Sequence, residues 1–453
     1  MIRAMRPAAV SVAVARLAVG RAGWVIGDQA LSSLTNFVLT LLVARAVSTE
    51  DFGAFALATT TYWLALGLAR ALTTEAFVVT YPDAEEAIAG RGVARVTGAA
   101  VGVGIAAGAA CLVAGLVLQG TLAKALLIMG PLLPGLLLQD AWRFAFFARR
   151  RGGAALANDL AWAIALVPTM LFALTLGGGS VTWLILAWGV SGNAAGLLGI
   201  VQARIRPQVR GTIAWWREQR ELAPRFFGEF LVRSVSSQLT TYGLAAFVGL
   251  RGVGGLRAAD LLLGPLNILF LANGLAGVAE GVRLLARGER TFRIAYVGLS
   301  AVLAACVLAW AGVLLLLPSA AGVQILGRSW TTARPLLIPV VLNTAAAAAG
   351  MGATTGLRAL AAARRSLRTR LSLAVVLLTA TLASAAVGGV YAAAWTMAAS
   401  SAVASAVWWR QFFAELGERR ARERAPSIRE RPDPTVGVRA PAADAGRPQG
   451  AAR

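Results

Sequence analysis

Long apolar runs recur along the chain, and short polar segments separate them. Each run is close to the roughly 20 residues that a helix needs to cross the hydrocarbon core of a bilayer. Such spans must be helices, because lipid offers no hydrogen-bond partner to an open backbone. The pattern predicts an all-α polytopic membrane protein with about 12 transmembrane helices. We expect the spans at residues 24–46, 53–79, 96–118, 125–147, 155–176, 180–202, 226–249, 258–282, 294–317, 335–357, 371–389 and 391–413.

The composition excludes an ordinary soluble domain. Of the 453 residues, 58% are hydrophobic and 14% are charged, whereas about a quarter of a typical soluble domain is charged. The chain has no His, which removes the commonest general base and the commonest metal ligand. The longest loop between spans, residues 203–225, is too short for a catalytic domain, and no P-loop motif is present. We expect neither an enzyme nor a bound cofactor.

Basic residues are unevenly divided between alternate loops. Loops on one side, together with both termini, hold 34 of the 43 Lys and Arg residues, and loops on the other side hold six. Cytoplasmic loops carry such an excess, so we expect a multi-pass protein of the bacterial cytoplasmic (inner) membrane with both termini in the cytoplasm. The net charge of +22 then reflects topology and attraction to anionic lipids, and nucleic-acid binding is not expected.

The spans fall into two halves with short flanking segments. The linker holds Trp215 and Trp216 beside alternating charges at 213–220, which suits a helix lying at the inner membrane interface. The C-terminal segment is poor in large apolar residues, which is typical of a disordered basic tail. The expected segments are a cytoplasmic lead-in (1–23), a six-helix bundle (24–202), the cytoplasmic linker (203–225), a second six-helix bundle (226–413) and the tail (414–453).

Two spans carry a polar stripe, and the stripes repeat at a fixed offset. Every fourth position of the first span is polar, at Asp28, Ser32, Asn36 and Thr40. The counterparts 201 residues later in the seventh span are Glu229, Arg233, Ser237 and Thr241. Gly53 and Gly254, which open the next helices, keep the same offset. Because each half has an even number of spans, the repeats are expected to be parallel.

Each stripe places its residues on one helix face, turned toward something other than lipid. Two like halves that face each other across a polar cleft are typical of a transporter. We therefore expect Ser32, Asn36, Thr40, Ser237 and Thr241 to line a cavity. The alternative is that the stripes hold helices together through hydrogen bonds.

Charged residues within the spans suggest binding and coupling sites. Arg70 and Arg233 lie seven to nine residues from the nearer span end, roughly 10–13 Å deep at a rise of 1.5 Å per residue. Arg stays charged and binds phosphate in a bidentate manner, so we expect these two to form an anion site. Arg257, at the outer end of the eighth span, either receives the anion or extends to the membrane surface.

The acidic residues lie closer to the inner boundary. Asp28 and Glu229 are within about two helical turns of it, so they suit ion coupling or an inner gate. Pairing with arginines at the membrane surface is the other interpretation. Within the fourth span, Asp140 and Arg143 are three residues apart and are expected to pair with each other.

Three regions of the sequence resemble one family of transporters. The first region contains DQALSSLTNF (28–37), LVAR (42–45) and DFGAF (51–55); the second contains GLRAAD (255–260) and LGPLN (263–267); the third contains GLRAL (356–360) and ARRSL (363–367). They resemble bacterial polysaccharide flippases of the O-antigen/teichoic-acid type, in the superfamily that also holds multidrug and toxin extruders and lipid II flippases. The resemblance implies two six-helix bundles in a V around a cationic cavity.

It also implies alternating access that moves a polyprenyl-pyrophosphate-linked oligosaccharide, a precursor of cell-surface polysaccharide, to the outer leaflet. Arg70, Arg233 and Arg257 would hold the pyrophosphate, and a polysaccharide polymerase or glycosyltransferase would be a partner. Without a nucleotide site, energy would come from an ion gradient or the membrane potential, through Asp28 or Glu229. The alternatives are a cation-coupled multidrug extruder and an integral-membrane glycosyltransferase or polymerase.

Overall fold

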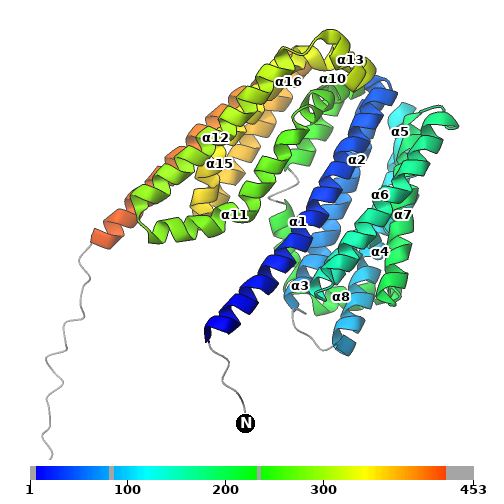
Figure 1. Cartoon of the computed structure of the whole chain (residues 1–453). Helices are drawn as coiled ribbons and strands as arrows, with labels where there is room; N and C mark the ends of the chain where they lie inside the picture. Colours follow the sequence, from blue (N-terminus) through cyan, green and yellow to red (C-terminus); the bar gives the residue numbers. More distant parts are fainter. Residues whose placement is uncertain (1–6, 81–85, 232–235, 425–453) are drawn as a thin grey trace, which may run out of the picture.

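The computed structural model describes residues 7–80, 86–231 and 236–424, which are almost entirely helical (Figure 1). The first half contains α1 (Pro7–Ala46), α2 (Thr49–Ala69), the π-helical turn η1 (Arg70–Thr74), α3 (Glu75–Thr80), α4 (Glu86–Val117), α5 (Gly120–Ala148), α6 (Gly152–Thr175) and α7 (Val181–Ala203). The linker contains η2 (Val209–Gly211), α8 (Thr212–Glu218) and α9 (Ala223–Phe230). The second half contains α10 (Ser236–Leu261), η4 (Gly264–Leu266), α11 (Asn267–Ala286), α12 (Glu289–Leu315), α13 (Ser319–Leu326), η5 (Gly327–Ser329), α14 (Trp330–Ala333), η6 (Arg334–Leu336), α15 (Leu337–Ala359) and α16 (Ala363–Arg424).

Two of the long helices are each a pair of arms that double back at a glycine. Gly249 in α10 has φ 69° and Gly389 in α16 has φ 66°, a left-handed conformation that glycine adopts without steric cost. Counting the arms separately, every expected span has a helical counterpart. The eighth span is interrupted where Pro265, within η4, separates α10 from α11. The last arm continues to Arg424, beyond the expected start of the tail, and residues 425–453 lie outside the described part.

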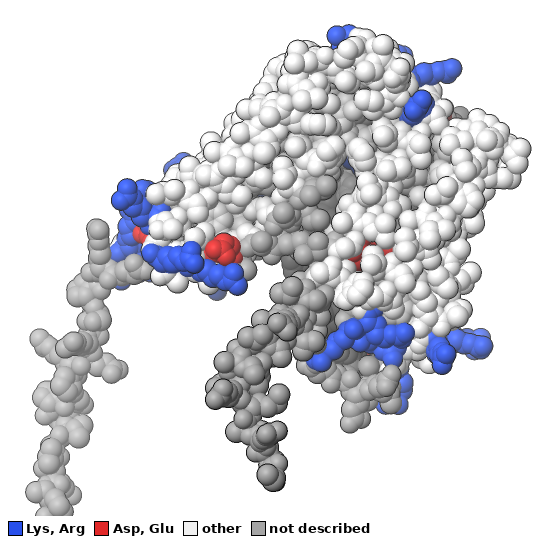
Figure 2. Space-filling model, viewed as in Figure 1, with Lys and Arg blue, Asp and Glu red and all other residues white. Residues whose placement is uncertain are grey.

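The described residues include eight helical segments that are long and apolar enough to cross a membrane, and one of them holds both arms of α16. Figure 1 shows two bundles that meet near one end, by α13 and the start of α2, and diverge toward the other end. Figure 2 shows Lys and Arg gathered at the diverging ends of both bundles, with others at the end where the bundles meet. The expected fold class, an all-α polytopic membrane protein with two pseudo-symmetric bundles, is confirmed.

The halves approach each other closely at two glycines related by the sequence repeat. A Cβ atom on Gly53 would lie 1.8 Å from the carbonyl oxygen of Leu250, and one on Gly254 would lie 2.0 Å from the carbonyl oxygen of Thr49. Leu250 and Thr49 are themselves 201 residues apart, so the contact is reciprocal. The backbones of α2 and the second arm of α10 therefore meet directly, as small residues allow in membrane helices. We call this contact the glycine clasp.

The linker packs against the first half at the diverging end. The side chain of Trp215 in α8 is fully buried, and its indole nitrogen donates to the carbonyl oxygen of Leu72 over 3.3 Å. Trp216 is 39% exposed. Trp215 thus anchors one face of α8 to the bundle, and Trp216 lies on a face that stays open.

Replacing a glycine of the clasp tests its importance. We expect Gly254→Val to lower the free energy of unfolding by about 1–3 kcal/mol, because the new side chain overlaps the backbone of Thr49. Thermal unfolding in detergent micelles measures this. Gly312→Val in α12 is the control, since nothing lies within 4 Å of a Cβ atom there. Equal melting temperatures for the two variants would contradict a tight clasp.

Candidate functional site

The first bundle contains a cluster of charged side chains from four elements, which we call the N-bundle cluster. Its centre is Arg143 of α5, whose guanidinium donates through Nε to Asp28 Oδ2 of α1. The same Nε lies 3.8 Å from Asp159 Oδ2 of α6, and Nη2 donates to Gln29 Oε1 over 3.3 Å. Asp28 is fully buried, so its charge depends on Arg143 for compensation.

Arg70 forms the second ion pair of the cluster. Its Nε and Nη2 donate to the two carboxylate oxygens of Asp140 over 2.8 and 2.6 Å, in a bidentate geometry. The guanidinium also lies 5.3 Å from the ring centre of Phe144. Arg70 is the first residue of η1, and its side chain stays 31% exposed while that of Asp140 is 6% exposed. A π-helical turn of this kind often marks a functional position.

Amides extend the cluster toward α7. Gln139 donates to Asp159 over 2.7 Å and to Asn158 over 3.2 Å, and Asn158 donates to the carbonyl oxygen of Ala195 over 2.9 Å. The cluster holds three carboxylates and two guanidiniums, which leaves one formal negative charge. Asp28 Oδ1 is buried and has no hydrogen-bond donor among the described residues. The cluster therefore has an open acceptor that a proton or a small cation could satisfy.

The stripe of the first span turns toward its own bundle. Ser32 and Asn36 line a small cleft together with Asp159 and Trp162 of α6. Further along, the Thr40 hydroxyl donates to the backbone carbonyl of Asn36 over 2.7 Å. The stripe thus leads along α1 to the N-bundle cluster.

A cavity of about 480 Å³ lies between the two halves, and we call it the central cavity. It is bounded by α2, both arms of α10, α15 and the second arm of α16. Arg257 Nη1 and Asp260 Oδ2 lie 3.1 Å apart at its wall, with side chains 48% and 56% exposed. The polar residues that line it are Thr59, Thr60, Gln238, Thr240, Thr241, Arg257, Asp260 and Asn343.

The structure thus distributes the candidate residues over two places. Thr241 and Arg257 line the central cavity, whereas Arg70 and Asp28 belong to the N-bundle cluster. Arg233 lies outside the described residues, and the side chains of Glu229 and Ser237 do as well. Thr59 and Thr60 also line the central cavity, although the sequence analysis did not single them out. The run of three threonines at 59–61 inside an apolar span was the feature that could have indicated them.

Several solved structures share this fold, although no protein-family model and no curated protein matches the chain. The lipid II flippase MurJ, in an inward closed conformation, has a TM-score of 0.61 at 9% identity, covering 86% of this chain and 88% of MurJ. A MOP superfamily transporter from Pyrococcus furiosus has a TM-score of 0.52 at 14% identity, covering 91% and 96%. A multidrug resistance MATE family transporter of the same superfamily, facing inward, has a TM-score of 0.53 at 14% identity, covering 87% and 96%. Identities this low show a shared fold alone.

Removing the central guanidinium of the N-bundle cluster tests its energetics. We expect Arg143→Ala to destabilise the protein by about 3–5 kcal/mol, because the fully buried Asp28 loses its compensating charge. The control is Arg283→Ala, which removes an exposed pair with Glu280 and should cost about 0–1 kcal/mol. Thermal unfolding in micelles compares the two. Similar melting temperatures would show that Asp28 carries no charge to compensate.

Proposed function

We propose that this chain is a transporter of the bacterial cytoplasmic membrane that moves a polyprenyl-pyrophosphate-linked oligosaccharide from the inner to the outer leaflet by alternating access. The observation that carries the proposal is the central cavity, which lies between two like halves and beneath the glycine clasp. The halves diverge toward the ends where Lys and Arg gather, and such ends face the cytoplasm. This conformation would therefore receive substrate from the inner side, with both termini in the cytoplasm.

The lining of the central cavity supports a glycan as the transported group. Hydroxyl and amide groups of Thr59, Thr60, Gln238 and Asn343 can exchange hydrogen bonds with sugar hydroxyls. Ala56 and Leu244 form apolar parts of the cavity wall. The lipid chain of the substrate would stay in the bilayer. Polar walls of this kind offset the cost of taking a hydrated sugar into the membrane.

The pyrophosphate would bind to the arginines that the sequence singles out. Arg257 lines the central cavity and is half-exposed, so an anion can approach it beside Asp260. Arg70 would contact a phosphate with the part of its side chain that stays exposed, while remaining paired with the buried Asp140. Arg233 belongs to the same proposed set, with Ser237 and Thr241 along the path of the glycan.

The N-bundle cluster would supply the coupling to an ion gradient. Protonation of Asp28 would neutralise the carboxylate that lies closest to Arg143. Asp159 would then become the ion-pair partner of Arg143. A change of partner among α1, α5 and α6 would alter how these helices pack. Glu229, the counterpart of Asp28 in the second half, would be the second carrier or part of an inner gate. A polysaccharide polymerase or glycosyltransferase would act on the product, and anionic lipids would surround the basic loops.

A cation-coupled multidrug extruder is the second candidate. The excess of carboxylates over guanidiniums in the N-bundle cluster favours it, because a site with one net negative charge attracts organic cations. A MATE transporter is among the structures that share the fold. An integral-membrane glycosyltransferase or polymerase is weaker, since the part of the chain that the structure describes holds no group of acidic residues that could bind a catalytic metal ion.

Leaflet exchange in liposomes tests the proposed function. We expect the wild type to move a fluorescent polyprenyl-pyrophosphate oligosaccharide between leaflets, and Arg257→Ala, Arg233→Ala and Arg70→Ala each to slow it at least about tenfold through loss of a charged contact. Arg283→Ala, at the membrane surface, is the control. Gradient-driven efflux of a cationic dye by the wild type, without exchange of the glycolipid, would establish the extruder instead.

Replacing Asp28 tests the coupling. We expect Asp28→Asn to exchange the glycolipid at a rate that no longer responds to a transmembrane pH gradient, because the amide cannot gain or lose the proton. The rate is measured with and without the gradient, and Glu221→Gln in the linker is the control. A gradient response in Asp28→Asn equal to that of the control would assign coupling to another residue.

A further inference from the structure

Among the described residues that line the central cavity, Trp63 of α2 is the one aromatic side chain. It is 41% exposed. Exposed tryptophans of membrane proteins commonly lie in belts at the two membrane interfaces. The other tryptophans of similar exposure do not line this cavity; they are Trp24, Trp183, Trp216 and Trp395. Trp63 borders the space between the halves, so a place in an interfacial belt does not account for its exposure.

Neighbouring aromatic rings hold Trp63 in place. Tyr62 is buried, and its ring centre lies 5.2 Å from that of Trp63 at an interplanar angle of 59°. Tyr62 in turn packs edge-on against the buried Trp188 of α7, with ring centres 4.9 Å apart and an angle of 87°. A ring supported in this way loses little conformational freedom when a ligand packs against it, so its position favours binding.

Two hydroxyl groups share the helix face of Trp63. Thr59 and Thr60 precede it by four and three residues, so the three side chains lie on one face of α2, and all of them line the cavity. The Thr59 hydroxyl donates to the carbonyl oxygen of Phe55 over 2.9 Å, and the Thr60 hydroxyl donates to that of Ala56 over 2.8 Å. A hydroxyl oxygen that donates one hydrogen bond still has two lone pairs with which to accept others. This face therefore combines an aromatic ring with two hydrogen-bond acceptors.

The second half carries different side chains at the equivalent positions. At the offset of 201 residues, Thr59 corresponds to Asp260 and Trp63 corresponds to Gly264. Arg257 and Asp260 are the charged residues that line the cavity in the described part of the chain, and they pair with each other over 3.1 Å. The aromatic ring is thus on the α2 wall, and the charged groups are on the α10 wall. A ligand with both an apolar surface and an anionic group fits between the two walls.

We infer that Trp63 packs against the first sugar of the transported glycolipid, a deepening that rests on the proposed function. The faces of a pyranose ring carry C–H groups and are apolar, whereas its hydroxyl groups point outward around the edge. One face packs against the indole ring, and hydroxyl groups at the edge donate to Thr59 and Thr60. The pyrophosphate, which is bonded to this sugar, reaches Arg257 on the opposite wall. A volume of about 480 Å³ is within the usual range for the site of a small ligand.

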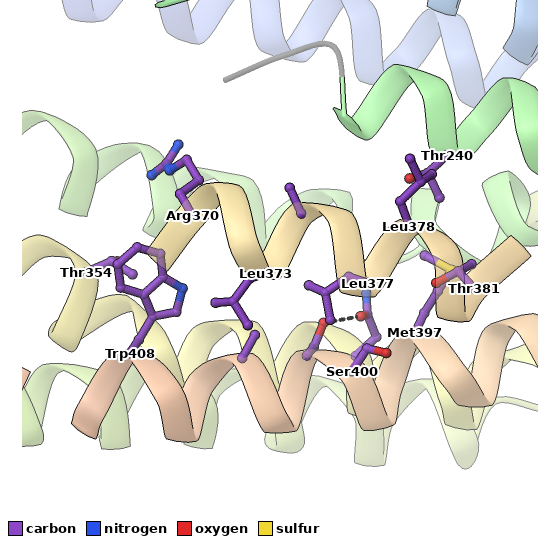
Figure 3. Close-up of a pocket in the computed structure, with 14 residues that line it drawn as sticks. Thr240, Thr354, Arg370, Leu373, Leu377, Leu378, Thr381, Met397, Ser400 and Trp408 are labelled. Carbon is purple, nitrogen blue, oxygen red and sulfur yellow. Dashed lines mark hydrogen bonds between the residues drawn. The ribbon is translucent and has the colours of Figure 1, made fainter. Parts of the chain in front are cut away.

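Space for the following sugars continues into the second half. Thr240, Asn343 and Met397 line the central cavity and also a neighbouring cavity of about 390 Å³. Figure 3 shows this neighbouring cavity along the arms of α16, with Thr240 and Met397 toward one end of it. The two cavities therefore adjoin, so an oligosaccharide that is longer than the central cavity has room beyond it.

Two other kinds of ligand could also pack against an indole ring. An organic cation does so through a cation–π contact. The central cavity does not favour a cation, because its described lining carries one guanidinium and one carboxylate and therefore no net negative charge. An acyl chain would contact the ring without using either threonine. A sugar uses both features of the α2 face.

Binding of the full-length protein in micelles to two fluorescent probes tests the inference. One probe is polyprenyl pyrophosphate that carries a single N-acetylglucosamine, and the other is polyprenyl pyrophosphate without a sugar. We expect Trp63→Leu to raise the Kd of the sugar-bearing probe about five- to tenfold, through loss of the aromatic contact, and to leave the Kd of the sugar-free probe unchanged. Trp63→Tyr, which keeps an aromatic ring, should retain most of the affinity.

Trp183→Leu is the matched control. Trp183 is also 41% exposed and packs against one aromatic neighbour, Phe172, but it does not line the central cavity. This variant should bind both probes as the wild type does. Thermal unfolding of each variant confirms that it has folded. Trp63→Gln, which should weaken sugar binding as Trp63→Leu does, serves if the leucine variant does not fold.

Three results would overturn the inference, and leaflet exchange by the wild type separates them from failure of the proposed function. If the wild type exchanges the glycolipid and Trp63→Leu binds the sugar-bearing probe like Trp183→Leu, the sugar site is wrong and the transport function stands. The same holds if Trp63→Leu weakens both probes equally, or if it weakens binding of the organic cation tetraphenylphosphonium and not of the sugar-bearing probe. If the wild type neither binds nor exchanges the glycolipid, both proposals fall together.

Discussion

Backbone contact between α2 and α10 at Gly53 and Gly254 is the interaction on which the arrangement of the two halves depends. Lipid surrounds the helices, so burial of apolar surface gives them little reason to associate, and close packing of small residues takes its place. The contact is reciprocal because each glycine meets the carbonyl of a residue at the equivalent position in the other half. The bundles diverge below this point, and the central cavity lies in the space that divergence leaves.

The low dielectric of the membrane interior imposes a second constraint, since each charge there needs a partner or a wet surface. In the first bundle the partners come from different helices: α1 and α6 supply acids to Arg143, and η1 supplies Arg70 to Asp140. Such a network holds the helices together only while its carboxylates keep their negative charge. In our proposal, the network that stabilises the bundle is also the part of it that responds to a proton or cation.

The two halves share an arrangement of helices but carry different side chains at equivalent positions. At the offset of 201 residues, Arg257 corresponds to Ala56 and Asp260 to Thr59, so one wall of the central cavity carries an ion pair where the other carries small and hydroxyl groups. The N-bundle cluster of the first half is rich in acids, whereas the second half places Arg257 at the wall of the central cavity. In our proposal the first half responds to ions and the second half receives the anionic substrate.

The sequence alone determined the spans, the loops and the repeat, because bilayer thickness and backbone hydrogen bonding leave a helix of about 20 apolar residues as the solution. It also located the reciprocal glycines through their offset. It did not determine ion pairing: Arg143 was expected to pair with Asp140 three residues away, but the two pair with Asp28 and Arg70 instead. It did not bring Arg143 and Asp159 together either, since they come from separate helices. Local periodicity shows which face of a helix is polar, but which faces meet depends on packing between segments far apart in the chain, and only the tertiary structure decides that.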